Sequence, residues 1–329
     1  MSLRGRLLQL MADGRFYSGA SLGRSLGVSR SAIWKHIHFL QARQVDIHAV
    51  RGRGYRLSRP LALLSRQAII RHMDDEQAVR LGRLDILMEV DSTNRFLLAR
   101  ARHGGLSGDA CLAEYQSAGR GRHGRVWVSP FAANIYLSLL WRFPYGAEGL
   151  GGLGLAVGVS VLRAVQSLGA QGVRLKWPND LVCEDRKLAG ILLEMNSDAD
   201  GGCHVVIGVG LNIRMSLPSS EGIDQPWTDL GQVLGRSQDE PLCRDYVAAC
   251  LLQQLLSDMT QFQFHGLRPF INDWRHFDNL LGRPVSLSTP AGEIKGIARG
   301  IDEHGALRID SEGSVRRYLS GDVSVRLGV

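Results

Sequence analysis

The chain has 329 residues, of which 44% are hydrophobic and 22% are charged, and its formal net charge is +7 at pH 7. This length predicts two or three domains, and the ordinary composition excludes intrinsic disorder on a large scale. Because no leader pattern, no run of eighteen uncharged apolar residues and no CxxC spacing among the five cysteines is present, we expect a cytoplasmic protein without a disulfide framework or a zinc site.

Residues 1–64 are expected to form a separate DNA-binding domain. Residues 3–14 have apolar positions at helical spacing, and Ser18 and Ser29 are suitable N-caps for two further helices separated by a short glycine-containing turn. Helix, short turn and helix is the helix-turn-helix pattern. Residues 45–58 then alternate like a strand pair and predict a basic wing.

The third helix and the wing carry the candidate DNA contacts. Polar and basic side chains lie near the start of that helix, where a recognition helix meets base edges and phosphates. The candidates are Arg30, Ser31, Trp34, Lys35, Arg51 and Arg53. The alternative is a small packing module whose basic residues are merely solvated. The consecutive order of helix pair, polar helix and basic hairpin favours DNA binding.

The rest of the chain predicts an α+β multidomain fold. Residues 65–278 alternate strands with amphipathic helices and are expected to form an α/β domain with a mixed sheet and helices on one side. A helix is expected over 153–169, ending at Gly169. Strands are expected within 84–94, 108–125, 134–143 and 204–213. Residues 279–329 give short strands broken by turns, which predicts a small SH3-like β-barrel.

The stretch GRGRHGR, residues 119–125, combines three glycines with three arginines. Glycines let backbone N–H groups surround an anion, and the forked guanidinium groups of Arg120, Arg122 and Arg125 suit phosphate or carboxylate. A polyphosphate or an acyl phosphate is the natural guest. The stretch matches neither a Walker A loop nor a dinucleotide fingerprint. On its own it is equally compatible with a solvated surface or a nucleic-acid contact.

Two further motifs carry polar groups. In KWPNDLV, residues 176–182, Pro178 fixes a turn after which Asn179 and Asp180 project from a constrained backbone. Lys187 stands at the start of a strand, where it supplies a compact charge for a carboxylate or an α-phosphate. In isolation, a turn-capping Asp180 and an exposed Lys187 are the simpler interpretation.

Together these segments resemble the bifunctional biotin protein ligases that also serve as biotin operon repressors. The resemblance covers essentially the whole chain, including the helix-turn-helix and wing. The matching segments, in the family's order, are DSTN (91–94), EYQSAGRGRHGRVWVSP (114–130), KWPNDL (176–181), RKLAGILLE (186–194), IGVGLNI (207–213) and IARGIDEHGAL (297–307).

The resemblance implies an enzyme that makes biotinyl-5′-adenylate from biotin and Mg-ATP. It then passes biotin to a lysine of the biotin carboxyl carrier protein of acetyl-CoA carboxylase, and it represses transcription at operator DNA. We also expect a ligand-promoted homodimer, because a single winged helix makes few base contacts. By position, the residues implied to bind biotin are Ser92, Thr93, Asn94, Gln116, Arg120, Gly121, Arg122, Trp127 and Lys187.

The resemblance also implies the catalytic residues Lys187, Arg122 and Asp180. Asn179 and Asp180 match residues near the metal and the incoming lysine, and both roles stay open for Asp180. The residues implied to bind the nucleotide are Arg122, Asn179, Asn212 and Trp227. Two alternatives are a biotin-sensing repressor without ligase activity and a lipoate or octanoate transfer enzyme, whose family is not expected to carry a helix-turn-helix.

Overall fold

The computed structural model describes residues 3–43, 45–58, 61–197, 201–215, 222–237, 240, 242–289, 292–319 and 324–327. Within these ranges the strands form three separate sheets along the chain, with two, seven and five strands. No helix in the described part of the chain combines the length and the apolar character needed to cross a membrane.

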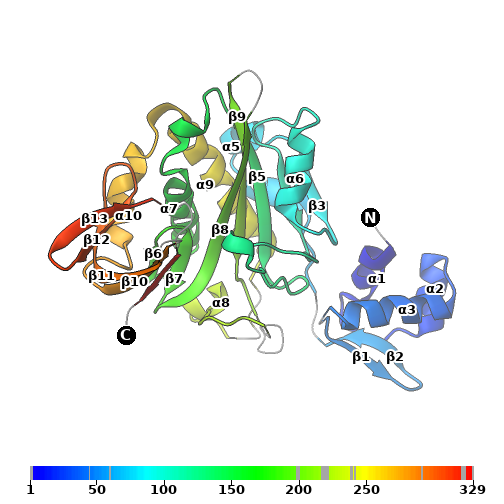
Figure 1. Ribbon diagram of the computed structural model, residues 1–329. Helices are drawn as coiled ribbons and strands as arrows, with labels where there is room; N and C mark the ends of the chain where they lie inside the picture. The colour runs from blue at the N-terminus through cyan, green and yellow to red at the C-terminus, as the bar shows by residue number, and fades with distance from the viewer. Residues whose placement is uncertain are drawn as a thin grey trace.

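The N-terminal domain is a helix-turn-helix followed by a hairpin (Figure 1). Its elements are α1 (Leu3–Met11), α2 (Gly19–Leu26), α3 (Arg30–Gln41), β1 (Ile47–Val50) and β2 (Gly54–Leu57). Ser18 and Ser29 cap α2 and α3 as predicted, because each hydroxyl accepts from a backbone N–H in the first helical turn. Gly27 ends α2 with a φ of 71°, a left-handed conformation that glycine adopts without strain.

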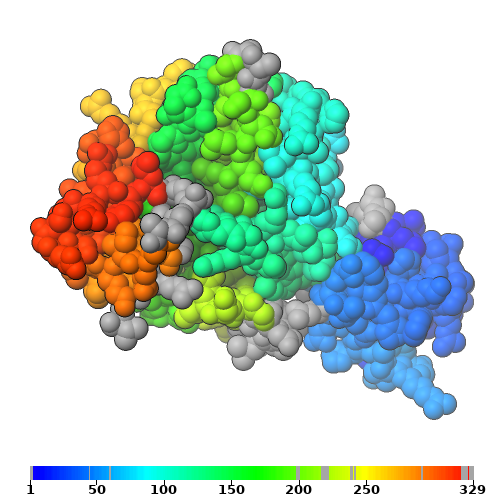
Figure 2. Space-filling model, in the orientation of Figure 1, coloured from blue at the N-terminus to red at the C-terminus, as the bar shows by residue number. Residues whose placement is uncertain are grey.

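This domain has an apolar core of its own. Leu7 and Leu8 of α1 pack with Leu22 of α2 and with Ile33 and Ile37 of α3. In the space-filling view the domain stands out at one side of the remaining molecule (Figure 2). The packing gives a separate unit in which the start of α3 and the hairpin are exposed.

The central domain is built on a mixed seven-stranded sheet. In spatial order the strands are β3 (Leu84–Leu87), β4 (Ala110–Ala113), β5 (Ile135–Phe143), β9 (Cys203–Leu211), β8 (Arg186–Ser197), β7 (Asp180–Cys183) and β6 (Val173–Lys176). Only β3 and β4 pair in parallel, and every other neighbouring pair in this sheet is antiparallel. The mixed sheet predicted from the sequence is confirmed.

Helices cover both faces of this sheet. The helices are α4 (Arg66–His72), α5 (Asp75–Arg80), α6 (Thr93–Ala101), α7 (Leu153–Ser167), α8 (Leu230–Val233), α9 (Arg244–His265) and α10 (Ile271–Phe277). Leu139 of β5 faces the main core with α7 and α9, whereas the next residue, Leu140, packs with Leu97 of α6 on the opposite face. The prediction of helices on one side is therefore wrong. Helices pack on both faces of the sheet because the inner strands carry apolar side chains on both faces.

The C-terminal domain is all β, as predicted. Its antiparallel strands in spatial order are β13 (Ser314–Tyr318), β12 (Leu307–Ser311), β11 (Gly292–Ile301), β10 (Pro284–Thr289) and β14 (Ser324–Leu327). Val285 and Leu287 belong to the same apolar cluster as the central core. The indole Nε1 of Trp177 donates to the carbonyl of Gly305 at 3.1 Å, so this domain is fixed against the KWPNDL segment.

The N-terminal domain contacts the central domain through a cluster of charges and rings. Arg4 and Arg43 both form ion pairs with Glu89, at 3.2 and 2.9 Å, and both guanidinium carbons lie 3.3 Å from the ring centroid of Phe39. Arg43 also lies 5.3 Å from the ring of Tyr115. Glu89 lies two residues before Asp91, and Tyr115 directly precedes Gln116, so this contact is close in sequence to two polar segments of the central domain.

Candidate ligand cleft and nucleic-acid surface

A cavity of about 890 Å³ opens where the first turn of α6, the 119–127 loop, strands β8 and β9 and the β6–β7 hairpin meet. It is large enough for a small organic ligand together with a nucleotide. Every residue of the central domain that the sequence nominated for ligand binding or catalysis lines it. These residues are Ser92, Thr93, Asn94, Gln116, Arg120, Gly121, Arg122, Trp127, Asn179, Asp180, Lys187, Asn212 and Trp227.

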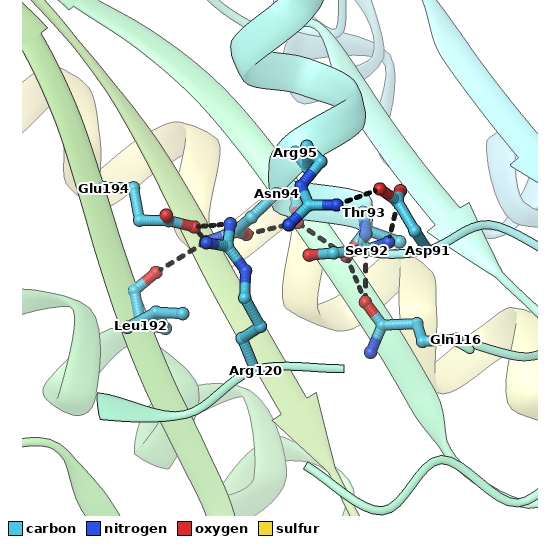
Figure 3. Close-up of polar contacts among 10 residues, drawn as sticks. Asp91, Ser92, Thr93, Asn94, Arg95, Gln116, Arg120, Leu192 and Glu194 are labelled. Carbon is cyan, nitrogen blue, oxygen red and sulfur yellow. Dashed lines mark hydrogen bonds and ion pairs between the residues drawn. The ribbon is translucent and has the colours of Figure 1, made fainter. Parts of the chain in front are cut away.

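One end of the cavity is a buried polar cluster. The backbone N–H and the hydroxyl of Thr93 both lie within hydrogen-bonding distance of Gln116 Oε1, at 2.9 and 3.1 Å. The amide of Asn94 donates to the Leu192 carbonyl at 3.2 Å and to Glu194 Oε2 at 2.9 Å (Figure 3). Because buried polar groups need partners, this end of the cavity suits a ligand with its own donors and acceptors.

Glycines on adjacent strands form the floor of the cavity. A Cβ added at Gly210 of β9 would lie 2.5 Å from Trp127 Cε2, and one added at Gly190 of β8 would lie 2.9 Å from the same indole ring. A Cβ at Gly208 would lie 2.3 Å from Asn94 Oδ1. The alternation IGVGL thus points two glycines to the cavity side, which lets Trp127 and Asn94 lie directly on the sheet.

The glycine-rich loop is closed by its own backbone. The N–H of Gly121 donates to the Arg125 carbonyl at 2.7 Å, and the N–H of Trp127 donates to the Gly119 carbonyl at 2.9 Å. The sequence led us to expect backbone N–H groups that surround an anion, but these two already have partners within the loop. Side chains of the loop also reach the cavity, since Arg122 and Arg125 line it.

Opposite the polar end, cations gather around the KWPNDL segment. Lys187 Nζ lies 2.8 Å from Asp180 Oδ1 and 5.6 Å from the ring centroid of Trp127. Lys176 also lines the cavity, and burial lowers the pKa of its ammonium group from the usual 10.5. This part of the cavity therefore favours a ligand that brings negative charge.

Lys187 is fixed in place by its backbone. Its N–H donates to the Pro226 carbonyl at 2.9 Å, and its carbonyl accepts from the N–H of Thr228 at 2.9 Å. Asn212 bridges the same segments, because its amide donates to the carbonyls of Thr228 at 3.0 Å and Lys187 at 3.3 Å. The segment that carries Trp227 is thus paired directly to the start of β8.

Sequence reasoning gave no role to several polar residues in or beside this cavity. Ser138 is fully buried on β5 and contacts Thr93, while Glu194 forms an ion pair with Arg120 at 2.8 Å. Asp185 lines the cavity and reaches Arg283 of the C-terminal domain at 2.7 Å. A signal existed for Ser138, because it is a lone serine in the apolar run IYLSLLW.

The candidate DNA contacts lie together on the N-terminal domain, apart from the cavity. Arg30, Ser31, Trp34 and Lys35 are exposed on α3, and the Trp34 side chain remains 53% accessible to solvent. Arg51 and Arg53 are exposed in the β1–β2 hairpin, where Arg53 also lies 4.3 Å from the ring of Phe16. An exposed helix flanked by a basic hairpin is the arrangement that enters a DNA groove.

Fold and site together define a protein that couples a helix-turn-helix domain to a small-molecule cleft. Three family profiles match: the helix-turn-helix domain over residues 6–56, the biotin/lipoate A/B protein ligase family over residues 87–212, and the biotin protein ligase C-terminal domain over residues 280–326. The chain belongs to the biotin/lipoate A/B protein ligase family, with the added helix-turn-helix of its bifunctional members.

Individual relatives agree with this placement. The chain is 42% identical to the bifunctional ligase/repressor BirA of Escherichia coli (strain K12), over 98% of this chain and 96% of that protein. It is 36% identical to the biotin–[acetyl-CoA-carboxylase] ligase of Mycobacterium tuberculosis, over 73% and 88%. The structure of the Aquifex aeolicus biotin protein ligase in complex with biotin and ATP superposes with a TM-score of 0.63 at 29% identity, covering 75% of this chain and all of that one.

Proposed function

We propose that this protein is a biotin protein ligase that also represses the transcription of biotin synthesis genes. It forms biotinyl-5′-AMP from biotin and ATP, and it transfers biotin to a lysine of the biotin carboxyl carrier protein of acetyl-CoA carboxylase. The observation that carries the proposal is one cavity that combines a buried polar end, an aromatic wall and a cationic end. The match to bifunctional ligase/repressors over nearly the whole chain supports both activities.

Biotin lies with its ureido ring at the polar end of the cavity. Ser92, Thr93, Asn94 and Gln116 bind the ureido group, since its N–H and C=O groups pair with buried hydroxyl and amide groups. Trp127 forms the wall along the apolar part of the ligand. The loop residues Arg120, Gly121 and Arg122 fold over the ligand and complete the biotin site.

In the first half-reaction a carboxylate oxygen of biotin attacks the α-phosphorus of ATP. An oxygen–phosphorus bond forms, and the bond to the leaving pyrophosphate breaks. Lys187 and Arg122 stabilise the negative charge that develops on the phosphate and carboxylate oxygens. The nucleotide is bound by Arg122, Asn179, Asn212 and Trp227. This assignment is supported by their position around the same cationic end of the cavity.

In the second half-reaction the amine of the carrier lysine attacks the acyl carbon, and AMP leaves. Asp180 and Lys187 are paired at 2.8 Å. An anionic ligand competes for the lysine, which leaves the carboxylate to accept a hydrogen bond and then a proton from the incoming amine. Of its two implied roles, we therefore assign Asp180 to the incoming lysine.

Mg²⁺ enters this scheme with ATP. No three His, Cys, Asp or Glu side chains among the described residues gather into a ready metal site. Mg²⁺ is commonly held by substrate phosphates, water and one or two carboxylates, and Asp185 and Asp224 both line the cavity. Asp185 and Asp224 would therefore help to hold a magnesium ion brought in with the nucleotide, and the ion would neutralise phosphate charge.

Repression requires the N-terminal domain. Arg30, Ser31, Trp34, Lys35, Arg51 and Arg53 contact operator DNA in this scheme. A single winged helix makes few base contacts, so we propose that bound adenylate favours a homodimer that places two copies on a palindromic site. Closure of the glycine-rich loop supplies the ligand-dependent step, which requires tighter adenylate binding by the dimer-competent form. Sedimentation with and without biotin and ATP tests it, and a monomer with bound adenylate would contradict it.

We also propose the domain boundaries. The DNA-binding domain spans residues 1–64, the catalytic domain residues 65–278 and the C-terminal domain residues 279–329. The start of α4 at Arg66 and the start of β10 at Pro284 support these limits.

Pyrophosphate release on addition of biotin and Mg-ATP tests the enzymatic proposal. We expect release that depends on biotin and is not supported by lipoate or octanoate. Arg122→Ala should weaken retention of the adenylate, whereas the matched change Arg102→Ala, at an exposed residue after α6, should leave it unchanged. A protein that binds biotin but releases no pyrophosphate would be a sensor without ligase activity, and the proposal would fail.

A further inference from the structure

Glu194 joins two parts of the biotin site that are far apart in the sequence. It lies near the end of the RKLAGILLE segment on β8, and its side chain is only 22% exposed. A single carboxylate oxygen, Oε2, accepts from Arg120 Nη2 at 2.8 Å and from Asn94 Nδ2 at 2.9 Å (Figure 3). Arg120 belongs to the glycine-rich loop and Asn94 to the first turn of α6. The carboxylate thus ties the loop and the polar end of the cavity together.

The hydrogen bonds of Asn94 fix which way its amide points. Its Nδ2 has two hydrogens, and their acceptors are Glu194 Oε2 and the carbonyl of Leu192. On the other side, Asn94 Oδ1 accepts from the hydroxyl of the fully buried Ser138 at 2.6 Å. An amide oxygen has two lone pairs, so Oδ1 is able to accept one further hydrogen bond.

The charge of Glu194 is what makes this orientation firm. A carboxylate is an acceptor only, so it excludes the flipped amide, which would turn Oδ1 toward a negative oxygen. Hydrogen bonds to an ionised group are also stronger than neutral ones. Because Asn94 lines the cavity, an amide fixed in this way suits a ligand head that carries an N–H.

The same carboxylate holds the loop. The ion pair links Arg120 to β8, and Arg120 pairs across the loop with Val126 through the backbone. Because both donors share one oxygen, a shift of the loop at Arg120 also disturbs the bond that orients Asn94. Loop position and ureido recognition are coupled at this atom.

We propose that Glu194 is a positioning residue that determines specificity at the biotin site. It holds the Asn94 amide with its oxygen toward the ligand, where that oxygen accepts from a ureido N–H, and it anchors the glycine-rich loop over the ligand. A lipoyl or octanoyl end has no N–H and gains nothing at Asn94. This inference rests on the proposed function, because biotin supplies the ureido group.

Titration of biotin into the full-length chain tests the proposal with two variants. Glu194→Ala removes both bonds, and we expect the dissociation constant to rise about 10- to 100-fold. Glu194→Gln keeps an oxygen that can accept from Asn94 but loses the charge, so its dissociation constant should lie between those of wild type and Glu194→Ala. In turnover assays KM should rise while kcat stays within about threefold, because Glu194 orients the bound ring and not the reacting atoms.

A matched control separates this role from loss of an ion pair in general. Asp310 pairs with Arg299 at 2.7 Å on the C-terminal sheet and has a 23% exposed side chain, so Asp310→Ala should leave biotin affinity unchanged. In an Asn94→Ala, Arg120→Ala background, Glu194→Ala should add less than about a twofold effect. Wild-type affinity in Glu194→Ala, or no recovery in Glu194→Gln, would overturn the inference. Failure of the wild-type chain to bind biotin would instead overturn the proposed function.

Discussion

A methyl group added at Gly210, on the glycine floor of the cavity, tests whether Trp127 forms a wall of the ligand site. In Gly210→Ala the new Cβ would meet three atoms of the Trp127 indole, Cε2 at 2.5 Å, Cζ2 at 2.6 Å and Nε1 at 2.9 Å. Carbon atoms in contact normally lie about 3.5–4.0 Å apart, so the ring must move by about 1 Å. Such overpacking costs about 1–3 kcal/mol. Because the ring forms a wall of the biotin site, we expect most of this cost to fall on ligand binding.

A cost of that size corresponds to a dissociation constant for biotin about 5- to 150-fold higher. Calorimetric titration measures it directly, and the fluorescence of the indole should report displacement of the ring. Gly151→Ala is the matched control, because its Cβ would have no atom within 4 Å and its φ is −53°. Unchanged biotin affinity in Gly210→Ala would refute the assignment of Trp127 as the wall of the site.

Three further results are expected. Lys187→Ala should slow pyrophosphate release about 100- to 1,000-fold without unfolding the chain, and near-normal release would remove this lysine from the mechanism. Arg283 holds the pKa of Asp185 down from 3.8 to about 2, so the stability that this pair adds is present above pH 3.8 and is lost as the pH falls toward 2. Thermal unfolding should therefore show a gap between wild type and Arg283→Ala that closes over this range, and a constant gap would contradict it. Arg43→Ala removes a partner of Glu89 and should speed proteolysis at the domain junction about two- to fivefold. Biotin affinity should not change. An unchanged rate of proteolysis would show that the contact does not hold the domains together.

Local signals allowed much of the fold to be predicted. Ser18 and Ser29 begin helices for reasons contained within a few residues, and the structure has the same two caps. The apolar strands at 134–143 and 204–213 also lie where their composition indicated. These features depend on backbone preference and hydrophobic pattern, which a single sequence displays.

Other features of the fold depend on contacts between residues that are far apart in the sequence. Helix α9 buries two charged residues, Arg244 and Asp258, among its apolar positions, which its local sequence does not explain. They are tolerated because Glu114 and Arg163, far away in the sequence, pair with them at 2.7 and 3.1 Å.

The same reason limited the prediction of the site. Motif residues such as Lys187 were found through resemblance, but the role of Glu194 depends on its contacts with Asn94 and Arg120, which lie 100 and 74 residues away in the sequence. The position of β9 between β5 and β8 likewise has no local signal, yet it brings Gly208 and Gly210 to the cavity floor.

The most direct test of the central claim is the mass of a carrier domain incubated with this protein, biotin and Mg-ATP. The account predicts that the carrier gains one biotinyl group on one lysine, that the gain requires both biotin and ATP, and that lipoate and octanoate give none. A carrier of unchanged mass, or one that gains a lipoyl or octanoyl group instead, would contradict it.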